Sequence, residues 1–553
     1  MMLDKRAAKS VTVKSSGPPL DLQEHLRRLE AEGLLQRVDR AIDKDSELHP
    51  LVRWQFQGGL REDERRAFLF TNVVDGSGHR YDVPVAVGAL AASAEIYAIG
   101  MGRPVEEIGD AWLRAIANPI APTPVTAAPC QDVVITGDAL RKPDGGLKRL
   151  PVPISTPGFD AAPYLTATLC ITRDPETGVR NMGTYRAQLK AADRLGVRMA
   201  ARPGGAGGYL HWQKYRKRKQ PMPIAIVVGC APVVMFTGPQ KLPIDCDEMA
   251  VSGALAGAPI RTVRALTVDL DLPADAEFVV EGLIDPELLE PEGPFGESHG
   301  HVALEGYNMS MQVTAITHKR NPVWLSILSE VTPSESSVLK RVAYEPRYLA
   351  HLRDTLAIKG VRRVAMHEAL SNLRKILFVQ FAPGVPRTEI WRALHGAATL
   401  QADIGKYIIG ISEDIEPDNL DAVFWSLAYR ANPIEDVHIA PYRSAGHGPK
   451  SEGGGGVEST MLIDATQKTA DPPISLPKRE FMERARAIWE ELKLPPITAR
   501  QPWHGYSLGD WDAVWDTFAE RAVKGQWEQT GRETLARRRA GLTPETPVKS
   551  VDE

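Results

Sequence analysis

A short Gly/Pro segment carries two glutamates at a spacing that suits acid–base chemistry. It reads E-G-P-F-G-E and runs from Glu292 to Glu297. On a helix, residues five apart would point about 140° away from each other, since there are roughly 3.6 residues per turn. Pro294 lacks a backbone N–H and glycine allows unusual backbone angles, so we expect a turn that directs both carboxylates into one cavity. A plain acidic surface turn is the alternative.

Two carboxylates that share a pocket repel each other. The pKa of either Glu292 or Glu297 should therefore rise. Enzymes obtain a carboxylic acid at neutral pH in this way, and such an acid can donate a proton to a substrate. The turn therefore predicts general acid chemistry.

Two further groups of residues suit the binding of charged ligands. The stretch N-M-G-T-Y-R, from Asn181 to Arg186, offers an amide oxygen, a flat polar ring and a guanidinium that fits carboxylate or phosphate. A surface strand with an ordinary arginine is the alternative. The stretch D-C-D-E, from Asp245 to Glu248, opens an apolar helix. Helix-dipole complementarity explains it by default, and a hard cation held by Glu248 and an amide oxygen is the sharper interpretation.

Three weaker signals surround these groups. His211 precedes a basic run at residues 214–219, which we interpret as a solvated helix face. The glycine cluster at residues 204–208 would let the backbone approach a phosphate, but it lacks a nucleotide-binding pattern. His299 and His301 are candidates for lining a pocket, with surface or structural histidines as the default interpretation.

The composition narrows the class of protein. At 553 residues, with 43% hydrophobic and 25% charged residues, the chain fits a soluble globular protein of two to four domains. The net charge of -4 gives no reason to expect nucleic acid or an anionic membrane as a partner. The four cysteines are far apart and form no C-x-x-C pair, so we expect a reducing cytoplasm and neither structural zinc nor a disulfide framework. No apolar run approaches the ~20 residues that would span a bilayer.

The elements that must position these residues change character along the chain. Asp21 and Glu24 begin a helix that Gly33 ends, and a Pro-rich stretch at residues 119–125 predicts a domain-boundary linker. Residues 130–330 favour strands, including 166–172, 224–228, 278–280 and 311–317, with one helical insertion at 212–219. Residues 335–470 alternate helix and strand patterns, and the glycine run at 453–456 predicts a flexible loop.

The last 80 or so residues are predicted to be helical. Their aromatic and aliphatic stripes, such as Phe481 with Ile488 and Trp511 with Trp515, are expected to form core or subunit contacts. The predicted organisation is a disordered lead-in (1–19) and four further segments, 20–125, 126–332, 333–475 and 476–553.

In this order the motifs resemble the UbiD-type decarboxylases, which use prenylated FMN. The resemblance runs from about residue 20 to residue 470 and is weak beyond about 480. Six stretches carry it: N-x-G-x-Y-R at 181–186, P-M-P-I-A-I-V-V-G at 221–229, the helix at Glu248, E-G-P-F-G-E at 292–297, D-I-E-P-D at 414–418 and I-D-A-T at 463–466.

The resemblance implies a mixed α/β (α+β) fold. Its parts are an N-terminal α/β domain, a central flavin-reductase-like split β-barrel that carries the cofactor, and a C-terminal α/β oligomerisation domain. The helices after 476 are an extension of that domain, and the oligomer is a homodimer or a homohexamer.

The resemblance also assigns roles to residues. Arg186, Glu292 and Glu297 match the catalytic set, while Asn181 and Glu248 match ligands of a divalent metal, usually Mn²⁺, with K⁺ as a further candidate ion. Many members supply a histidine within the segment corresponding to 203–211, where this chain is Gly-rich, so the displaced His211 is the candidate third ligand and that position stays open. The implied cofactor contacts are Asn181, Met182, Thr184, Tyr185, Arg186, Arg198, Met199, Ala200, His211 and Glu248.

The implied activity is reversible, non-oxidative decarboxylation of an aromatic or α,β-unsaturated carboxylic acid, free or as a CoA thioester. Loss of CO2 from an sp² carbon leaves a carbanion, and the cofactor supplies the electron sink. Arg186 would orient the substrate carboxylate and hold Glu292, and Glu297 would donate the proton. A flavin prenyltransferase would supply the cofactor, and the extended C-terminus argues for a catabolic enzyme of aromatic acids.

Three alternatives remain open from the sequence. The first is a carboxylase, or a subunit of one, that acts on a phenolic compound, because no residue records the direction of an equilibrium. The second is a split-barrel flavin reductase or binding protein that uses ordinary FMN. The third is a catalytically silent oligomeric scaffold, against which the intact Arg186, Glu292 and Glu297 argue.

Overall fold

A computed structural model describes most of the chain. It covers residues 17–201, 206–242, 246–369, 375–401, 404–444, 457–469, 475, 477–497 and 513–543. The chain divides into two compact units, Met1–Gly410 with Asn432–Asp464, and Ile411–Ala431 with Ala465–Glu553. No helix in the described part combines the length and the apolar character that crossing a bilayer requires.

The first part of the chain confirms the predicted start of a helix. Asp21 caps α1 (Leu22–Ala31) and accepts the backbone N–H of Glu24 at 2.7 Å. Three more helices follow, α2 (Leu48–Gln57), α3 (Ala94–Met101) and α4 (Val105–Ala117). The short strands are β1 (Leu35–Val38), β2 (Ile42–Asp43), β3 (Ala67–Phe70), β4 (Val73–Val74), β5 (Arg80–Tyr81) and β6 (Val85–Val87). A four-stranded sheet has the order β1-β3-β6-β21, so β21 (Trp324–Ser326) from much later in the chain completes it.

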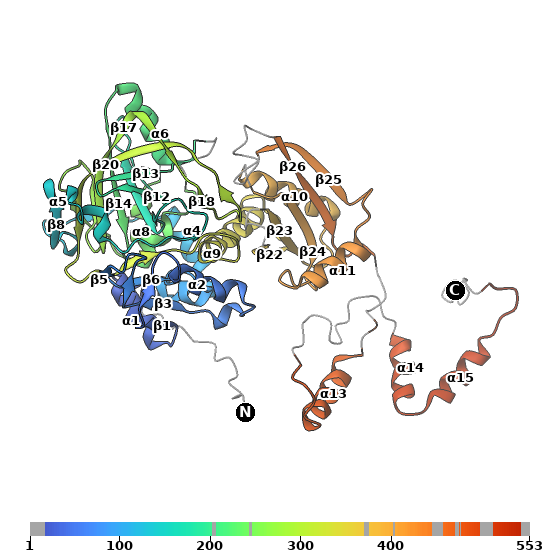
Figure 1. Ribbon diagram of the computed structural model, residues 1–553. Helices are drawn as coiled ribbons and strands as arrows, with labels where there is room; N and C mark the ends of the chain where they lie inside the picture. Colours follow the sequence, from blue (N-terminus) through green and yellow to red (C-terminus); the bar gives the residue numbers. More distant parts are fainter. Residues whose placement is uncertain are drawn as a thin grey trace. The chain divides into compact units, whose positions relative to one another are not determined.

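A nine-stranded sheet follows (Figure 1), and the candidate residues lie on its strands or in the loops and short elements that connect them. Its order is β11-β10-β14-β17-β20-β13-β12-β9, with β8 also paired to β20. The strands are β8 (Val133–Thr136), β9 (Tyr164–Leu165), β10 (Thr168–Arg173), β11 (Arg180–Gly183), β12 (Ala187–Ala191), β13 (Arg194–Val197), β14 (Met222–Val228), β17 (Phe278–Glu292) and β20 (Gly306–His318). The prediction of a strand-rich region is confirmed, and the pairing among the described residues is an open path with no closed barrel.

Two long antiparallel strands form the middle of this sheet. β17 and β20 lie side by side, with Phe278 opposite His318 at one end and Glu292 opposite Gly306 at the other. Short elements fill the rest of the region: α5 (Asp138–Arg141), α6 (Gly207–Arg218), α7 (Pro232–Thr237), α8 (Glu248–Ala256), β18 (Phe295–Gly296) and β19 (Val302–Ala303). The Pro-rich stretch contains β7 (Thr123–Pro124), which pairs with β15 (Arg261–Arg264), itself paired with β16 (Asp271–Pro273). Part of the expected linker is therefore built into a small sheet.

The following region has its own sheet and its own hydrophobic core. The sheet order is β22-β23-β24-β26-β25, from β22 (Val361–Met366), β23 (Ile376–Phe381), β24 (Tyr407–Ser412), β25 (Val437–Ser444) and β26 (Val457–Ala465). The helices are α9 (Glu335–Ala350), α10 (Arg387–Leu400) and α11 (Leu420–Arg430). The predicted alternation of helix and strand is confirmed here.

The helices at the end of the chain contradict one expectation. They are α13 (Arg479–Glu491), α14 (Ala513–Val523) and α15 (Trp527–Ala536), and none of their residues is buried. Ile488 keeps 57% of its surface exposed, so the helices themselves form no core around this stripe. Subunit contact stays a prediction. Residues 1–16, Trp511 and the glycine run at 453–456 lie outside the described residues.

Candidate active site

One arginine binds both glutamates of the acidic turn. Arg186 Nε donates to Glu292 Oε1 at 2.7 Å, and Nη2 donates to Glu292 Oε2 at 2.9 Å. Nη1 of the same guanidinium donates to Glu297. The side chains of Glu292, Arg186 and Glu297 keep 0%, 8% and 12% of their surface exposed. The three groups that the sequence singled out therefore meet in one place.

Local structure explains how the two glutamates converge. Glu292 ends β17, and Gly293 takes a φ of 105°, which strongly favours glycine. The chain then returns as β18, where Phe295 pairs with Ala303 of β19. Glu297 follows directly, and its backbone N–H donates to His301 O at 3.0 Å. The tight return brings the second carboxylate back to the arginine that the first one binds.

Two aromatic rings shield this ion-pair network. The Arg186 guanidinium lies 4.6 Å from the centre of the Phe295 ring and 5.9 Å from that of Tyr164. The two rings are 4.4 Å apart. Burial acts to lower the pKa of Arg186, but the charge of Glu297 and the bonds to Glu292 outweigh it, so the pKa is raised. Arg186 therefore stays charged, whereas the expected proton on one glutamate stays a prediction.

A large cavity opens beside the network. Its volume is about 2140 Å³, whereas pockets for small ligands usually measure about 300–1,000 Å³. Most of the candidates line it: Asn181, Thr184, Tyr185, Arg186, Arg198, Met199, Ala200, His211, Glu248, Glu297 and His301. Met182 is buried instead and donates its backbone N–H to Glu248 at 3.0 Å. Gly204, Gly205 and Asp245 lie outside the described residues.

Two further residues of the cavity lining, Asn181 and Glu248, offer oxygen ligands to a cation. Glu248 begins α8, next to β11, which carries Asn181. A Cβ on Gly207 would lie 2.0 Å from Asn181 Oδ1, so only glycine lets α6 approach this amide. Burial raises the pKa of Glu248 to about 7, as expected for a carboxylate without a bonded cation. Amide and carboxylate oxygens fit a hard divalent metal.

His211 lies on α6, one turn beyond Gly207. Its Nδ1 is 2.9 Å from Thr172 Oγ1, and burial lowers its pKa to about 4, so the ring is neutral at physiological pH. A neutral imidazole with one nitrogen held by a hydroxyl is suited to metal binding through the other nitrogen.

The cavity lining also fits a flat aromatic cofactor. Tyr185 Oη accepts from Gly208 N at 3.2 Å and from Asn181 Nδ2 at 3.1 Å, so its ring is fixed at the cavity surface. A Cβ on Gly183 would lie 2.3 Å from that hydroxyl, and one on Gly238 would lie 2.8 Å from Thr184 Oγ1. Glycine at both positions lets the backbone pack closely against these side chains, and the cavity volume accommodates a flavin together with a substrate.

Comparison with known proteins places the chain in a family. Profiles of 3-octaprenyl-4-hydroxybenzoate carboxy-lyase match it in three parts. They are the N-terminal domain at residues 26–116, the Rift-related domain at 123–331 and the C-terminal domain at 337–465. The chain belongs to the UbiD family of carboxy-lyases.

Solved structures of UbiD-class enzymes agree with this assignment. HmfF from Pelotomaculum thermopropionicum in complex with FMN is 30% identical, with a TM-score of 0.73 over 84% of this chain and 99% of that one. An evolved dimeric form of HmfF in complex with prFMN is 29% identical, with a TM-score of 0.70 over 83% and 97%. Vanillic acid decarboxylase from Sedimentibacter hydroxybenzoicus in its closed form is 25% identical, with a TM-score of 0.69 over 86% and 99%. The mixed α/β fold is thus the fold of UbiD-class enzymes.

Sequence reasoning missed several side chains around the UbiD-type site. Asn308 Nδ2 donates to Glu292 Oε2 at 3.2 Å, and Gln188 Oε1 accepts from Gly293 N at 3.3 Å. Asp160 accepts the backbone N–H of Gly296 at 2.8 Å. These partners come from other strands and loops, and nothing in their local sequence indicates the contact.

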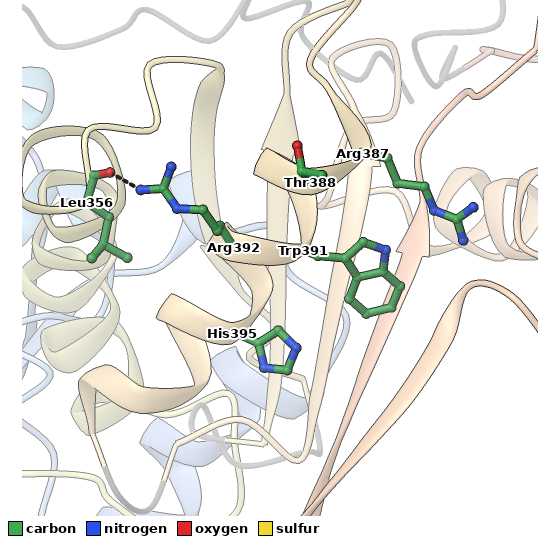
Figure 2. A pocket seen from close by; sticks show the side chains of 6 residues that line it. All are labelled: Leu356, Arg387, Thr388, Trp391, Arg392 and His395. Carbon is green, nitrogen blue, oxygen red and sulfur yellow. Dashed lines mark hydrogen bonds between the residues drawn. The ribbon is translucent and has the colours of Figure 1, made fainter.

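A second, smaller cavity of about 600 Å³ lies beside α10 (Figure 2). Leu356, Arg387, Thr388, Trp391, Arg392 and His395 line it. Its arginines are already bound, since Arg387 donates to Asp436 at 2.7 Å and Arg392 donates to the carbonyl oxygen of Leu356 at 2.6 Å. The paired carboxylates are absent from this lining, so the larger cavity is the candidate active site.

Proposed function

We propose that this UbiD-family chain is a reversible, non-oxidative decarboxylase of an aromatic or α,β-unsaturated carboxylic acid that uses prenylated FMN and a divalent metal. The observation that carries the proposal is a buried arginine that binds two glutamates at the wall of a cavity large enough for cofactor and substrate. The relatives named HmfF in complex with prFMN and vanillic acid decarboxylase support the cofactor and the substrate class.

The residues that line the cavity have different roles in this proposal. Asn181 and Glu248 hold the metal, with His211 as the candidate third ligand, and Tyr185 with its neighbours receives the flavin. When bound, prenylated flavin supplies the electron sink that the carbanion needs and that no side chain provides. The central sheet then corresponds to a flavin-reductase-like split barrel, and the predicted domain limits at 125, 332 and 475 remain part of the proposal.

Arg186 orients the substrate in this mechanism. Its Nη1 edge faces the cavity side of the network and binds Glu297 in the free protein. A substrate carboxylate competes for this edge, so substrate binding weakens the hold of the guanidinium on Glu297. Loss of a positive partner raises the pKa of a carboxyl group, which favours the protonated form of Glu297.

Glu297 then delivers the proton to the carbon that CO2 leaves. Glu292 stays bound through both oxygens and fixes the guanidinium plane, while Phe295 and Tyr164 exclude water from the ion pairs. The three groups thus divide the work, because Arg186 orients the substrate, Glu292 holds the arginine and Glu297 transfers the proton. The reverse reaction uses the same groups, so the geometry does not choose between decarboxylase and carboxylase.

The test is reconstitution of the purified protein with prenylated FMN and Mn²⁺. CO2 release and H/D exchange at the product carbon are measured across a panel of aromatic and α,β-unsaturated acids. We expect turnover of at least one acid and exchange into the matching product. Inactivity across a broad panel with the cofactor bound would count against the proposal.

An ordinary FMN flavoprotein is the second candidate, because the HmfF relative was also solved in complex with FMN. The mass and absorption spectrum of the cofactor that purified protein releases distinguish the two. Unmodified FMN together with NADH oxidation would favour the second candidate. We further propose a homo-oligomer that receives its cofactor from a flavin prenyltransferase.

A further inference from the structure

A second loop holds the backbone of the acidic turn. We call residues 153–164 the supporting loop and residues 292–297 the acidic turn. Asp160 of the supporting loop accepts Gly296 N at 2.8 Å through Oδ1. Its Oδ2 accepts Thr156 N at 2.8 Å and Ser155 N at 3.1 Å. One carboxylate therefore ties the acidic turn to the supporting loop.

Further contacts join the same two segments. The backbone N–H of Ala161 donates to Pro294 O at 3.0 Å, and Tyr164 Oη is 3.4 Å from the same oxygen. A Cβ on Gly296 would lie 2.1 Å from Thr156 Oγ1, so the turn presses directly on the loop. The backbone between the two glutamates thus follows the shape of the supporting loop.

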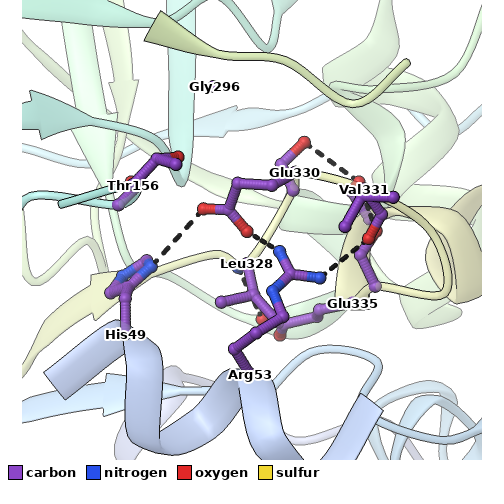
Figure 3. A network of polar contacts seen from close by, with 12 residues as sticks. His49, Arg53, Thr156, Gly296, Leu328, Glu330, Val331 and Glu335 are labelled. Atoms are coloured by element: carbon purple, nitrogen blue, oxygen red, sulfur yellow. Dashed lines mark hydrogen bonds and ion pairs between the residues drawn. The ribbon is translucent and has the colours of Figure 1, made fainter. Parts of the chain in front are cut away.

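The supporting loop is itself backed by a buried polar network (Figure 3). His49 Nε2 is 2.9 Å from Ser326 Oγ, and His49 Nδ1 lies 3.8 Å from Glu330 Oε1. Glu330 forms an ion pair with Arg53 of α2. Thr156 and Gly296 lie beside this network in Figure 3. This network joins helix α2 to β21 and to the segment that follows it.

The two glutamates depend on these contacts to different degrees. Glu292 lies on β17 and is fixed by strand pairing and by two bonds to Arg186. Glu297 directly follows Gly296, whose N–H is the group that Asp160 binds. A change at Asp160 should therefore move Glu297 relative to Arg186 and leave Glu292 in place.

We propose that Asp160 is a positioning residue for the proton donor Glu297. The inference rests on the proposed decarboxylase function for its kinetic consequence. Its structural part, the dependence of the Arg186–Glu297 contact on Asp160, stands without that function.

The Asp160→Asn variant changes the hydrogen bonds of this side chain but keeps its size. An amide of the same size keeps one acceptor oxygen and turns an NH2 group towards either Gly296 N–H or the Ser155 and Thr156 pair. A donor that faces a donor is unfavourable, and a shift of the turn relieves it. A misplaced proton donor should lower kcat about 10- to 100-fold with little change in KM, because substrate binding relies on Arg186.

The matched control is Asp75→Asn. Asp75 Oδ1 accepts Ser77 N at 2.9 Å and His79 N at 3.0 Å in a surface hairpin, so the same chemistry is lost far along the chain from the turn. We expect this variant to lose stability without loss of kcat. Crystal structures of both cofactor-free variants give the second readout: Asp160→Asn should lose the Arg186–Glu297 hydrogen bond, and Asp75→Asn should keep it.

The outcomes separate the two proposals. An inactive wild type with an intact cofactor contradicts the decarboxylase function, and the cofactor-free structures still test Asp160. An active wild type with an Asp160→Asn variant of equal kcat and an unchanged Arg186–Glu297 contact overturns the positioning role. Equal losses of kcat in Asp160→Asn and Asp75→Asn would overturn it as well, because they indicate a general loss of stability.

Discussion

Two glutamates of the candidate active site have their charge balanced in different ways. Glu292 at the acidic turn is bound through both oxygens by Arg186. Glu248 at the start of α8 accepts a backbone N–H from Met182, and no side-chain cation in the described part of the chain is bonded to it. Glu292 therefore has its counter-charge within the protein, whereas Glu248 is suited to a positive charge that comes with a ligand.

This difference indicates how the site is assembled. Charges that must orient a substrate are fixed by folding, so they are in place before any ligand arrives. A carboxylate whose pKa is raised to about 7 becomes a good ligand when a metal ion replaces its proton. Four predictions test the contrast.

The largest effect should follow from removing the proposed proton donor. Glu297→Gln keeps the shape and the contact with Arg186 but cannot release a proton, so kcat should fall about 10²- to 10⁴-fold. Turnover and H/D exchange of the reconstituted enzyme measure it. Glu305→Gln, an exposed carboxylate on the same cavity, is the control. Wild-type turnover in Glu297→Gln would refute its role as donor.

Removing the arginine should expose the cost of an unpaired buried carboxylate. Arg186→Met leaves Glu292 buried without its cation, which should lower the free energy of unfolding by about 3–5 kcal/mol. Denaturant unfolding measures the change, and the Arg186→Met/Glu292→Met double variant should recover much of it. Arg261→Met removes the exposed ion pair with Asp275 and should cost less than about 1 kcal/mol. A loss in Arg186→Met no greater than in this control would contradict the contrast.

The stability of the protein should respond to pH and to metal through Glu248. Folding raises the pKa of Glu248 from 4.5 to about 7, so its contribution to stability is present below pH 4.5 and is lost as the pH rises through about 7. The loss is about 2 kcal/mol once the exposed part of the side chain is taken into account.

The measurement compares thermal unfolding of the metal-free wild type and of Glu248→Gln at pH 5 and pH 8, with and without Mn²⁺. Mn²⁺ should stabilise the wild type most at the higher pH, because the ionised carboxylate is then available to bind it. The Gln variant should lack both responses. Equal stabilisation of the two proteins by Mn²⁺ would show that Glu248 is not a ligand of the metal.

The smallest effect concerns the third ligand. His211→Ala should weaken Mn²⁺ binding about 10-fold, through loss of a ligand or of its support. Isothermal titration with Mn²⁺ measures it, and His79→Ala on a surface hairpin is the control. If His211→Ala binds Mn²⁺ like the wild type, the third position belongs to another group.

Local signals in the sequence predicted local structure well. The cap at Asp21 and the apolar strand at 224–228 both formed as expected, because each depends on neighbours a few residues away. The aromatic stripes of the last helices predicted an apolar face but not its partner, for the same reason. An amphipathic pattern shows that a helix has an apolar face, but it does not show what covers that face.

The catalytic candidates were recognised from the order of motifs and from a family resemblance, not from their geometry. Arg186 and Glu292 are 106 residues apart in the sequence, and Asp160 and Gly296 are 136 apart. The type of each residue indicated its chemistry, and Gly293 and Pro294 indicated a turn. No local pattern indicated Asp160 or Asn308, since a single polar side chain in a loop looks the same in the sequence whether it faces solvent or a buried partner.

The sequence by itself determined which groups are present: one guanidinium, two carboxylates on a turn, and an amide and a carboxylate suited to a cation. It also determined the strands and helices that carry them, because backbone preference and apolar periodicity act over short distances. Only the tertiary structure decided which charges are paired and which await a ligand. Pairing requires contacts between strands and loops that are distant in the chain. Because these groups are buried from water, leaving one of them unpaired costs free energy.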